Sequence, residues 1–584
     1  MILIDRPLNE TEKLSISSLE KLDITDVNTA KNLIKIDIFN WIDHAEQYQI
    51  NGKSPENFFS IGGESYWLHI RARIFFELYN DAQILDRIPD LNFLDQVTKV
   101  YCERENQAFW KRWAPQAELI ISKREENNAV NVGANFLSRL KYAIYNLRSQ
   151  KQLLKKRWDA IAFSPMSGTI LRNGQLIDRK LEPLFESTKR EILRLEYQTI
   201  PTFIPKNITT SFLSNPRKTA TVSTDVLLLN FVLSHPIVAF KKVIQVRHKQ
   251  KTDDSIRCSY KFLYKNKVWQ SYLNQLYLSF RRSLYQFHLF RSMFATLLRN
   301  VNPDFVLATG ESNNIGRIFI EESKKNGIPN FGIQHGDISP HNIDYRYSKS
   351  LSANAFPDYF FSWGNASREY LSKQSHLLKN TIFSVGQLEF DTISKSIEYD
   401  HEIGKFRRNR KKKVLFFASQ QQQNQKSRIE TARLLAEFCN KNGLCCVVKL
   451  HPGEDRDNLH QQMFNDEGIT EDLLVLECDV YSAIVSSDYS STCYSTIAWE
   501  AMSLKKPLII FDPLELNLLD LKDVPSVLFV SNADVNFRAW SVKAEQHIIA
   551  NSQLAEEKLG PRDGNTAKRM INKIDKIVYS KFEF

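Results

Sequence analysis

Hydrophobic and polar positions along residues 304–337 follow the pattern of a strand, a helix and a second strand. The apolar run 305–308 is followed by apolar positions at helical spacing over 315–320 and by a third apolar stretch over 328–333. Gly327, a usual helix stop, stands between the helix and the second strand. Two strands joined by one helix are parallel, with a right-handed crossover.

The loops that follow these two strands are polar and carry groups that can do chemistry. Glu311 comes shortly after the first strand and His335 shortly after the second. In parallel sheets, ligands bind beyond the carboxyl ends of the strands. We therefore expect Glu311 and His335 to lie on the rim of an active site.

The same alternation of apolar runs and amphipathic stretches extends over both halves of the chain. Strands are expected at 158–163, 356–364, 383–386, 414–418, 444–450, 473–476 and 507–511, and helices over 431–440 and 495–504. This pattern predicts an α/β protein with two doubly wound Rossmann-type domains. Helical patterns over 83–152 and 240–300 predict extra helices in the N-terminal half.

A basic, apolar-poor run at 405–413, KFRRNRKKK, is interpreted as the linker between the two domains. The predicted domains are then 1–404 on the acceptor side and 414–584 on the nucleotide side. A nucleic-acid-binding tail is the alternative, which is disfavoured because a strand is expected directly after the run.

The N-terminal residues give weaker signals. A Gly-Gly loop at 60–65 precedes a helical pattern, and such a loop can approach a ligand closely. A plain loop is the favoured alternative. Apolar residues over 33–38 fit either a strand or a short helix.

Composition places the chain among globular proteins with more than one core. Its 584 residues are 42% hydrophobic and 25% charged, and the formal net charge is +11. That charge fits a basic patch facing an anionic ligand or the negative leaflet of a membrane, or scattered solvated lysines. The basic and aromatic residues over 240–300 recur at helical spacing, so a buried aromatic face is favoured over nucleic-acid binding.

Cysteine use and apolar runs bear on the compartment. The seven cysteines contain no CxxC pair, which indicates reduced thiols and no metal site. The N-terminus lacks the pattern of a signal peptide. The apolar run 226–240 is interrupted and shorter than the ~20 residues that span a bilayer. We expect a cytoplasmic protein, with peripheral attachment to the inner face of an anionic plasma membrane as a further expectation.

A cation and an imidazole follow the predicted strand at 444–450. Lys449 and His451 lie on the same side of an extended chain, and Pro452 before Gly453 stiffens the loop. This combination suits a phosphate group. A surface His-Pro turn is the alternative.

Hydroxyl residues gather before the predicted helix at 495–504. Ser490, Ser491, Ser495 and Thr496 are expected to offer donors to an anion beside the free N–H groups of the helix start. Glu500 lies one turn beyond Thr496, within reach of a ribose hydroxyl. Ordinary N-capping by Ser495 or Thr496 is the alternative.

Over roughly residues 300–575 the chain resembles glycosyltransferases of the GT-B fold. It is similar in particular to bacterial capsule and lipopolysaccharide transferases for Kdo or sialic acid, and to the CDP-glycerol glycerophosphotransferases of teichoic-acid synthesis. The resemblance is carried by the order and spacing of GIPNFGIQHG, PDYFFSWG, KLHPGE, SSDYSSTCYSTIAWEAMSLKKPLIIF and LGPRDGNTAKRMINKI. It implies two Rossmann-type domains that face a cleft.

The resemblance also implies a reaction. The chain would be a metal-independent glycosyltransferase or glycerophosphotransferase that uses a nucleotide-linked donor, first of all a CMP- or CDP-linked one. The acceptor would be a cell-surface polysaccharide or a lipid-linked glycan. Neither a cofactor nor a nucleic-acid partner is expected.

The family's functional residues carry over to matching positions of this chain. His451, Pro452, Ser490, Ser491, Ser495 and Thr496 would bind the donor phosphate. His335 would face the cleft as the base that deprotonates the acceptor, and Glu311 would orient His335 or act as the base itself. The acidic D/E-D/E-G motif of sialyltransferases has no clear copy here, which disfavours a sialic acid donor.

Two other functions remain open at this point. A nucleotide-sugar 2-epimerase would use the same scaffold, although the long N-terminal part does not suit one. A non-enzymatic scaffold of envelope biosynthesis is the other alternative.

Overall fold

The computed structural model shows two compact units in the chain. The first comprises residues 1–135, 231–292 and 347–352, and the second comprises 136–230, 293–346 and 353–584. The described residues are 2–4, 21–23, 60–61, 64–67, 69, 71, 88, 94, 96–102, 110, 114, 116–121, 132–166, 169–172, 175–197, 217–254, 262–264, 267–269, 272–339, 342, 345, 356–393, 397–419, 425–451, 458–513, 515 and 517–580.

The first unit contains a four-stranded parallel sheet of order β2-β1-β5-β6. Its strands are Ile2–Ile4, Lys21–Asp23, Lys99–Cys102 and Glu118–Ile121, in the order β1, β2, β5 and β6. The prediction of helix throughout 83–152 is therefore wrong for β5 and β6. Their apolar residues are buried in one small core with Leu3 and Trp110, a tertiary environment that overrides the helical pattern.

Two hairpins also belong to the first unit. Ser60–Ile61 (β3) pairs antiparallel with Glu64–Ser65 (β4), where a loop was expected. Phe262–Tyr264 (β12) pairs antiparallel with Lys267–Trp269 (β13). The expectation for 33–38 lies outside the described residues.

The second unit holds two parallel sheets, and the first has the order β11-β10-β7-β14-β15-β16-β17. Its strands are Ala160–Pro165 (β7), Ile192–Tyr197 (β10), Thr221–Ser223 (β11), Phe305–Ala308 (β14), Asn330–Ile333 (β15), Tyr359–Ser362 (β16) and Ile382–Ser384 (β17). The predicted strand–helix–strand unit is confirmed as β14, α12 (Asn314–Lys325) and β15, with β14 parallel to β15.

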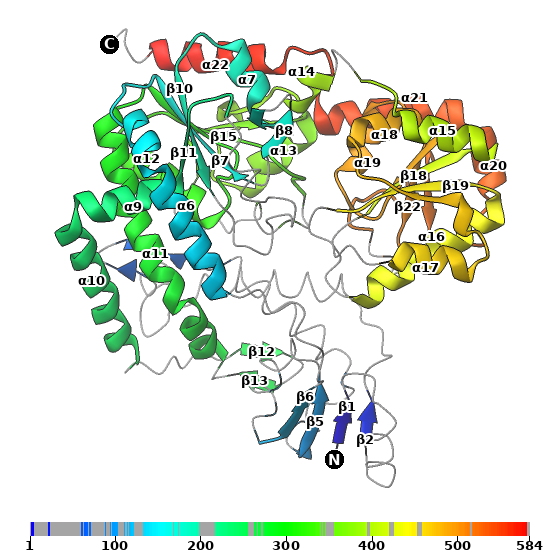
Figure 1. Ribbon diagram of the computed structural model, residues 1–584, viewed down its shortest axis with the longest axis horizontal. Helices are drawn as coiled ribbons and strands as arrows, with labels where there is room; N and C mark the ends of the chain where they lie inside the picture. Colours follow the sequence, from blue (N-terminus) through cyan, green and yellow to red (C-terminus); the bar gives the residue numbers. More distant parts are fainter. Residues whose placement is uncertain are drawn as a thin grey trace. The chain divides into compact units, whose positions relative to one another are not determined.

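This first sheet and the helices packed on it form the first domain. They include α6 (Val132–Leu153), α7 (Glu182–Ser187), α13 (Asn365–Gln374) and α14 (Glu389–Ile393). The core also takes in α22 (Thr566–Ser580), whose residues Ala567, Met570, Ile574 and Val578 are buried with Phe305 and Phe331. Figure 1 shows α22 beside α7, although the two are almost 400 residues apart in sequence.

The second sheet is six-stranded and parallel, with the order β20-β19-β18-β21-β22-β23. Its strands are Val414–Ala418 (β18), Cys445–Lys449 (β19), Leu473–Val475 (β20), Tyr489–Thr492 (β21), Leu508–Phe511 (β22) and Val527–Val530 (β23). The helices of this second domain are α15 (His401–Arg410), α16 (Gln425–Asn442), α17 (Leu459–Asp466), α18 (Val480–Ser486), α19 (Ile497–Ser503), α20 (Phe537–Val542) and α21 (Ala544–Leu559). The predicted fold of two doubly wound Rossmann-type domains is confirmed.

The basic run at 405–413 forms most of α15 and the turn before β18. Asp400 caps the helix by accepting bonds from two backbone N–H groups. Ile403 is buried in the core of the second domain, and Arg407 pairs with Asp488 at 3.0 Å. The residues expected to link the domains thus pack on the second one, while the domain limits at 404 and 414 stay a prediction.

Among the described residues, no single helix is long and apolar enough to cross a membrane. One sharply bent pair, α9 (Thr224–Ser234) with the first part of α10 (Pro236–Asp254), passes the same criteria of length and composition when its two helices are taken together.

Candidate functional site

The rim loop that follows β14 depends on a close approach between α12 and the end of β14. Asn313 caps α12 by accepting a bond from the N–H of Gly316 at 2.8 Å. A Cβ on Gly316 would lie 1.9 Å from the carbonyl oxygen of Gly310. Glycine at this position therefore allows the helix to hold the loop that carries Glu311.

The structure brings together the two residues predicted to be catalytic. His335 Nδ1 lies 3.8 Å from Glu311 Oε2, and the Tyr345 hydroxyl lies between the two side chains. Tyr345 donates to Glu311 Oε1 at 3.0 Å and lies 3.2 Å from His335 Nδ1. Glu311 is almost fully buried, whereas 27% of the His335 side chain is exposed.

The polarity of these bonds fixes the state of the imidazole. A phenol has one proton, which here goes to the Glu311 oxygen, because a carboxylate only accepts. The phenol oxygen then accepts from Nδ1–H of His335. The tautomer that fits this chain of bonds leaves the lone pair on Nε2 of His335.

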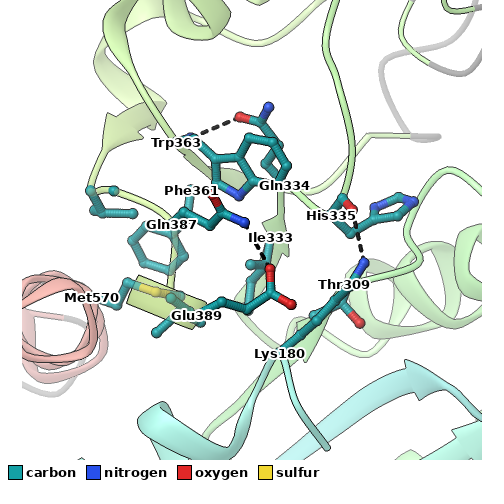
Figure 2. A pocket seen from close by; sticks show the side chains of 13 residues that line it. Lys180, Thr309, Ile333, Gln334, His335, Phe361, Trp363, Gln387, Glu389 and Met570 are labelled. Carbon is teal, nitrogen blue, oxygen red and sulfur yellow. Dashed lines mark hydrogen bonds between the residues drawn. The ribbon is translucent and has the colours of Figure 1, made fainter. Parts of the chain in front are cut away.

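A cation lies on the other side of His335. Lys180 Nζ donates to the His335 backbone carbonyl at 2.8 Å, and it meets this carbonyl rather than the ring (Figure 2). Burial and the Lys180 charge together lower the pKa of His335 to about 3. Burial likewise lowers the pKa of Lys180. At neutral pH the imidazole is therefore uncharged.

His335 is one of the residues that line a narrow pocket at the carboxyl edge of the first sheet. The pocket is lined from the ends of β14, β15, β16 and β17 by Thr309, Gln334, His335, Trp363, Gln387 and Glu389, with Lys180 closing it (Figure 2). Gln334 Oε1 accepts from the Trp363 N–H at 2.7 Å, which joins two of these strand ends. The pocket lies where a parallel sheet binds ligands.

Two carboxyl groups flank Gln387, one from each domain. Its amide donates to Glu389 Oε2 at 2.8 Å and to Glu500 Oε1 at 3.3 Å. Arg179 forms an ion pair with Glu389 at 2.7 Å. Burial raises the pKa of Glu389, but Arg179 and Lys180 outweigh it, so the pKa of Glu389 is lowered.

Glu500 is placed in this cluster rather than at an open surface. Burial first and the Glu389 charge second raise the pKa of Glu500 to about 7. The carboxyl is 7% exposed and binds Gln387. Ribose binding by Glu500 stays a prediction.

The hydroxyl residues divide between a strand and a helix start. Ser490 and Ser491 are buried in β21, and the Ser491 hydroxyl donates to the Phe416 carbonyl of β18 at 2.9 Å. Ser495 accepts from the Ile497 N–H at 3.3 Å, whereas Thr496 makes no side-chain cap. The sheet thus engages the hydroxyl of Ser491, and the role of these residues in donor binding stays a prediction.

The phosphate-binding candidates Lys449 and His451 lie at the carboxyl end of β19. Both side chains are half-buried. Pro452 and Gly453 lie outside the described residues. In the described part of the chain, no group of three or more His, Cys, Asp or Glu is arranged to hold a metal ion.

Four residues of the site were missed at the sequence level: Lys180, Tyr345, Gln387 and Glu389. A signal was present for Gln387 and Glu389, since they follow Gly386 at the end of an expected strand, as Glu311 follows Gly310. No local pattern marks Tyr345, which is ten residues beyond His335 in sequence.

No protein-family model matches the sequence, and no curated protein matches it either. Among solved structures, the chain is similar to an S. aureus MnaA–UDP co-structure, at 12% identity and a TM-score of 0.43, covering 72% of this chain and 96% of that one. A Neisseria meningitidis UDP-GlcNAc 2-epimerase bound to UDP-GlcNAc shows 13% identity and a TM-score of 0.41, covering 71% and 99%.

The wall teichoic acid polymerase TagF is a third similar structure. It shares 11% identity at a TM-score of 0.40, covering 78% of this chain and 99% of that one. Similarity at this level leaves the reaction of this chain open.

Proposed function

We propose that this protein is a transferase that moves a sugar or a glycerophosphate from a nucleotide donor, CMP- or CDP-linked in the first instance, to a hydroxyl of a glycan or lipid-linked acceptor. The observation that carries the proposal is the group formed by Glu311, Tyr345 and His335 at the carboxyl edge of the first sheet. It holds a neutral imidazole with a lone pair on Nε2, which is what deprotonation of an acceptor hydroxyl requires.

In the proposed reaction, His335 Nε2 takes the proton of the acceptor hydroxyl. The acceptor oxygen forms a bond to the reacting carbon or phosphorus of the donor. The bond from that atom to the nucleotide breaks, and the nucleotide leaves with the electron pair. Glu311, 3.8 Å from His335 Nδ1, stabilises the imidazolium that forms.

The second domain supplies the proposed donor side. Lys449 and His451 end β19, and Ser495 and Thr496 precede α19. A cation, an imidazole and hydroxyl groups can neutralise and bind the phosphate of the leaving nucleotide. Similar structures were determined with UDP, with UDP-GlcNAc and with CDPG, which agrees with a nucleotide-linked donor.

The test combines nucleotide binding with turnover. CMP, CDP, UDP and GDP are compared for their effect on the melting temperature, and CMP or CDP is expected to raise it most, because a ligand stabilises the state that binds it. Release of nucleotide in the presence of an acceptor glycan is then measured. Stabilisation by GDP alone would contradict the proposed donor.

Single substitutions test the residues. His335→Ala and His451→Ala are each expected to lower turnover about a hundredfold or more, the usual contribution of acid–base groups. His376→Ala is the matched control, since it removes another half-buried imidazole of the first domain, whose ring centroid lies 5.6 Å from that of Phe356. Turnover near the wild-type rate in both test variants would refute the mechanism. Epimerisation of a nucleotide sugar in the absence of an acceptor would show that the protein is an epimerase and not a transferase.

A further inference from the structure

The junction of α9 and α10 exposes apolar side chains that a folded protein normally buries. The two helices meet at His235 with a bend of 103° (Figure 1). Six large apolar side chains here are between 36 and 70% exposed: Val232, Leu233, Ile237, Val238, Phe240 and Ile244. We refer to residues 232–248 as the α9–α10 elbow.

The exposed residues form a stripe with helical spacing. Ile237, Phe240 and Ile244 stand at positions i, i+3 and i+7 of α10, which places them on one face. Ala239 and Val246, on the opposite face, are buried. The helix thus already packs an apolar face inward, and the outer stripe is a second one.

Exposed apolar residues are more concentrated in the elbow than in the rest of the described chain. The described residues present fourteen exposed large hydrophobic side chains, and six of them fall within the thirteen positions 232–244. Single exposed apolar residues are common, but a contiguous group marks an interaction site.

The charge of the elbow indicates its partner. From Val226 to Thr252 the sequence contains no Asp or Glu but five basic residues, namely Lys241, Lys242, Arg247, Lys249 and Lys251. Lys241 and Arg247 are exposed next to the apolar stripe. An apolar stripe flanked by cations is complementary to the boundary between acyl chains and anionic headgroups.

We propose that the α9–α10 elbow lies in the surface of an anionic bilayer, with Ile237, Phe240 and Ile244 among the acyl chains and Lys241 and Arg247 at the headgroups. Neither helix alone is long and apolar enough to span a bilayer, and the two meet at a bend of 103°, so we place the elbow in the membrane surface. This holds whatever group the protein transfers.

Vesicle flotation tests the proposal with the full chain. The wild type is expected to float with phosphatidylcholine vesicles that contain about 30% phosphatidylglycerol and to float less with phosphatidylcholine alone. Raising the salt should weaken binding, because the headgroup attraction is screened. The triple variant Ile237→Ser, Phe240→Ser, Ile244→Ser should bind at least about tenfold more weakly to both kinds of vesicle.

A second variant distinguishes the contribution of charge to vesicle binding from that of the apolar residues. Lys241→Glu with Arg247→Glu should remove the preference for phosphatidylglycerol. The control is Val542→Ser with Ile549→Ser, which changes exposed apolar residues elsewhere and should bind as the wild type does.

Three results would overturn the proposal. The wild type would remain unbound with both vesicles, or the triple serine variant would bind as tightly as the wild type. A wild-type dimer that the triple variant converts to a monomer, without vesicle binding by either, would assign the elbow to a second copy of the chain.

Discussion

Tyr345 connects an imidazole and a carboxylate that hold no hydrogen bond to each other. The phenol donates to Glu311 and accepts from His335, and this order selects one tautomer. Burial and Lys180 lower the pKa of His335, so the ring stays uncharged over the whole neutral range. Selection of the tautomer and control of the charge thus come from different neighbours.

Removal of the bridging hydroxyl tests this arrangement. Tyr345→Phe is expected to lower kcat about tenfold to a hundredfold, because the imidazole loses the partner that holds its tautomer. The donor KM should stay close to wild type, since Glu311, His335 and Phe360, which Tyr345 contacts, all belong to the first domain. Tyr399→Phe, at an exposed tyrosine, is the control. A fall in kcat that is accompanied by a marked fall in melting temperature would show a structural role instead.

Strands bounded by glycine or proline and buried on both faces could be predicted from the sequence. β14, β18 and β22 are continuous apolar runs, which is how a parallel strand covered by helices appears, and β15 is apolar at Phe331 and Ile333 and buried throughout. Their carboxyl ends were therefore placed correctly, and with them Glu311 and His335. Topology alone then brought these two residues to one edge.

β10 could not be predicted because it contains buried charges. Arg194 and Glu196 are both at most 1% exposed within this strand. Arg194 pairs with Asp178 at 3.0 Å, and Glu196 pairs with Arg217. A charged residue in a sequence indicates a surface unless its partners are known, and these partners come from other elements. Tyr345 was missed because no local pattern marks it and its partners Glu311 and His335 are known only from the fold.

The close approach of α12 to β14 gives a prediction at the level of the element. Gly316→Ala should destabilise the protein by about 2 kcal/mol or more and should lower activity, because the new Cβ would meet the Gly310 carbonyl oxygen 1.9 Å away. Urea unfolding measures the loss of stability.

A second glycine-to-alanine change provides the control for that measurement. Gly404 also lies in a helix, α15, where a Cβ would have only Arg408 Nη1 nearby, at 3.7 Å. Gly404→Ala should therefore raise stability by about 0.5–1 kcal/mol through helix propensity. Equal effects of the two substitutions would contradict the packing at Gly316.

At the scale of the whole molecule, the two Rossmann-type domains are joined by side chains as well as by the chain. Lys558 of α21 pairs with Asp337, two residues beyond His335, at 2.9 Å, and lies over the Trp499 ring of α19. Close backbone contacts accompany this pairing, since a Cβ on Gly364 would lie 2.1 Å from the Glu557 carbonyl oxygen. Gln387 adds the bond to Glu500.

The Glu500 contact makes stability depend on pH. Its pKa is raised from 4.5 to about 7, so between these values the folded protein keeps a proton that the unfolded chain has lost. Stability from this group is therefore present below pH 4.5 and is lost as the pH rises through about 7. Above that range the buried Glu500 carboxyl is charged and is repelled by the charge of Glu389.

Glu500→Gln should remove this dependence. The variant is expected to be more stable than the wild type by about 1–3 kcal/mol at pH near 8, and the difference should shrink toward pH near 5. Urea unfolding at both pH values measures it. Glu398→Gln changes an exposed carboxyl and should show no such difference. A variant less stable than the wild type at the higher pH would contradict a charged Glu500.

The position of α22 constrains how this protein is made. Four of its side chains complete the core of the first domain, and they are supplied by residues 567–578, after the entire second domain. During synthesis, the ribosome has released every strand of the seven-stranded sheet long before it reaches these residues. The second domain can therefore fold while the earlier domain still waits for its last helix.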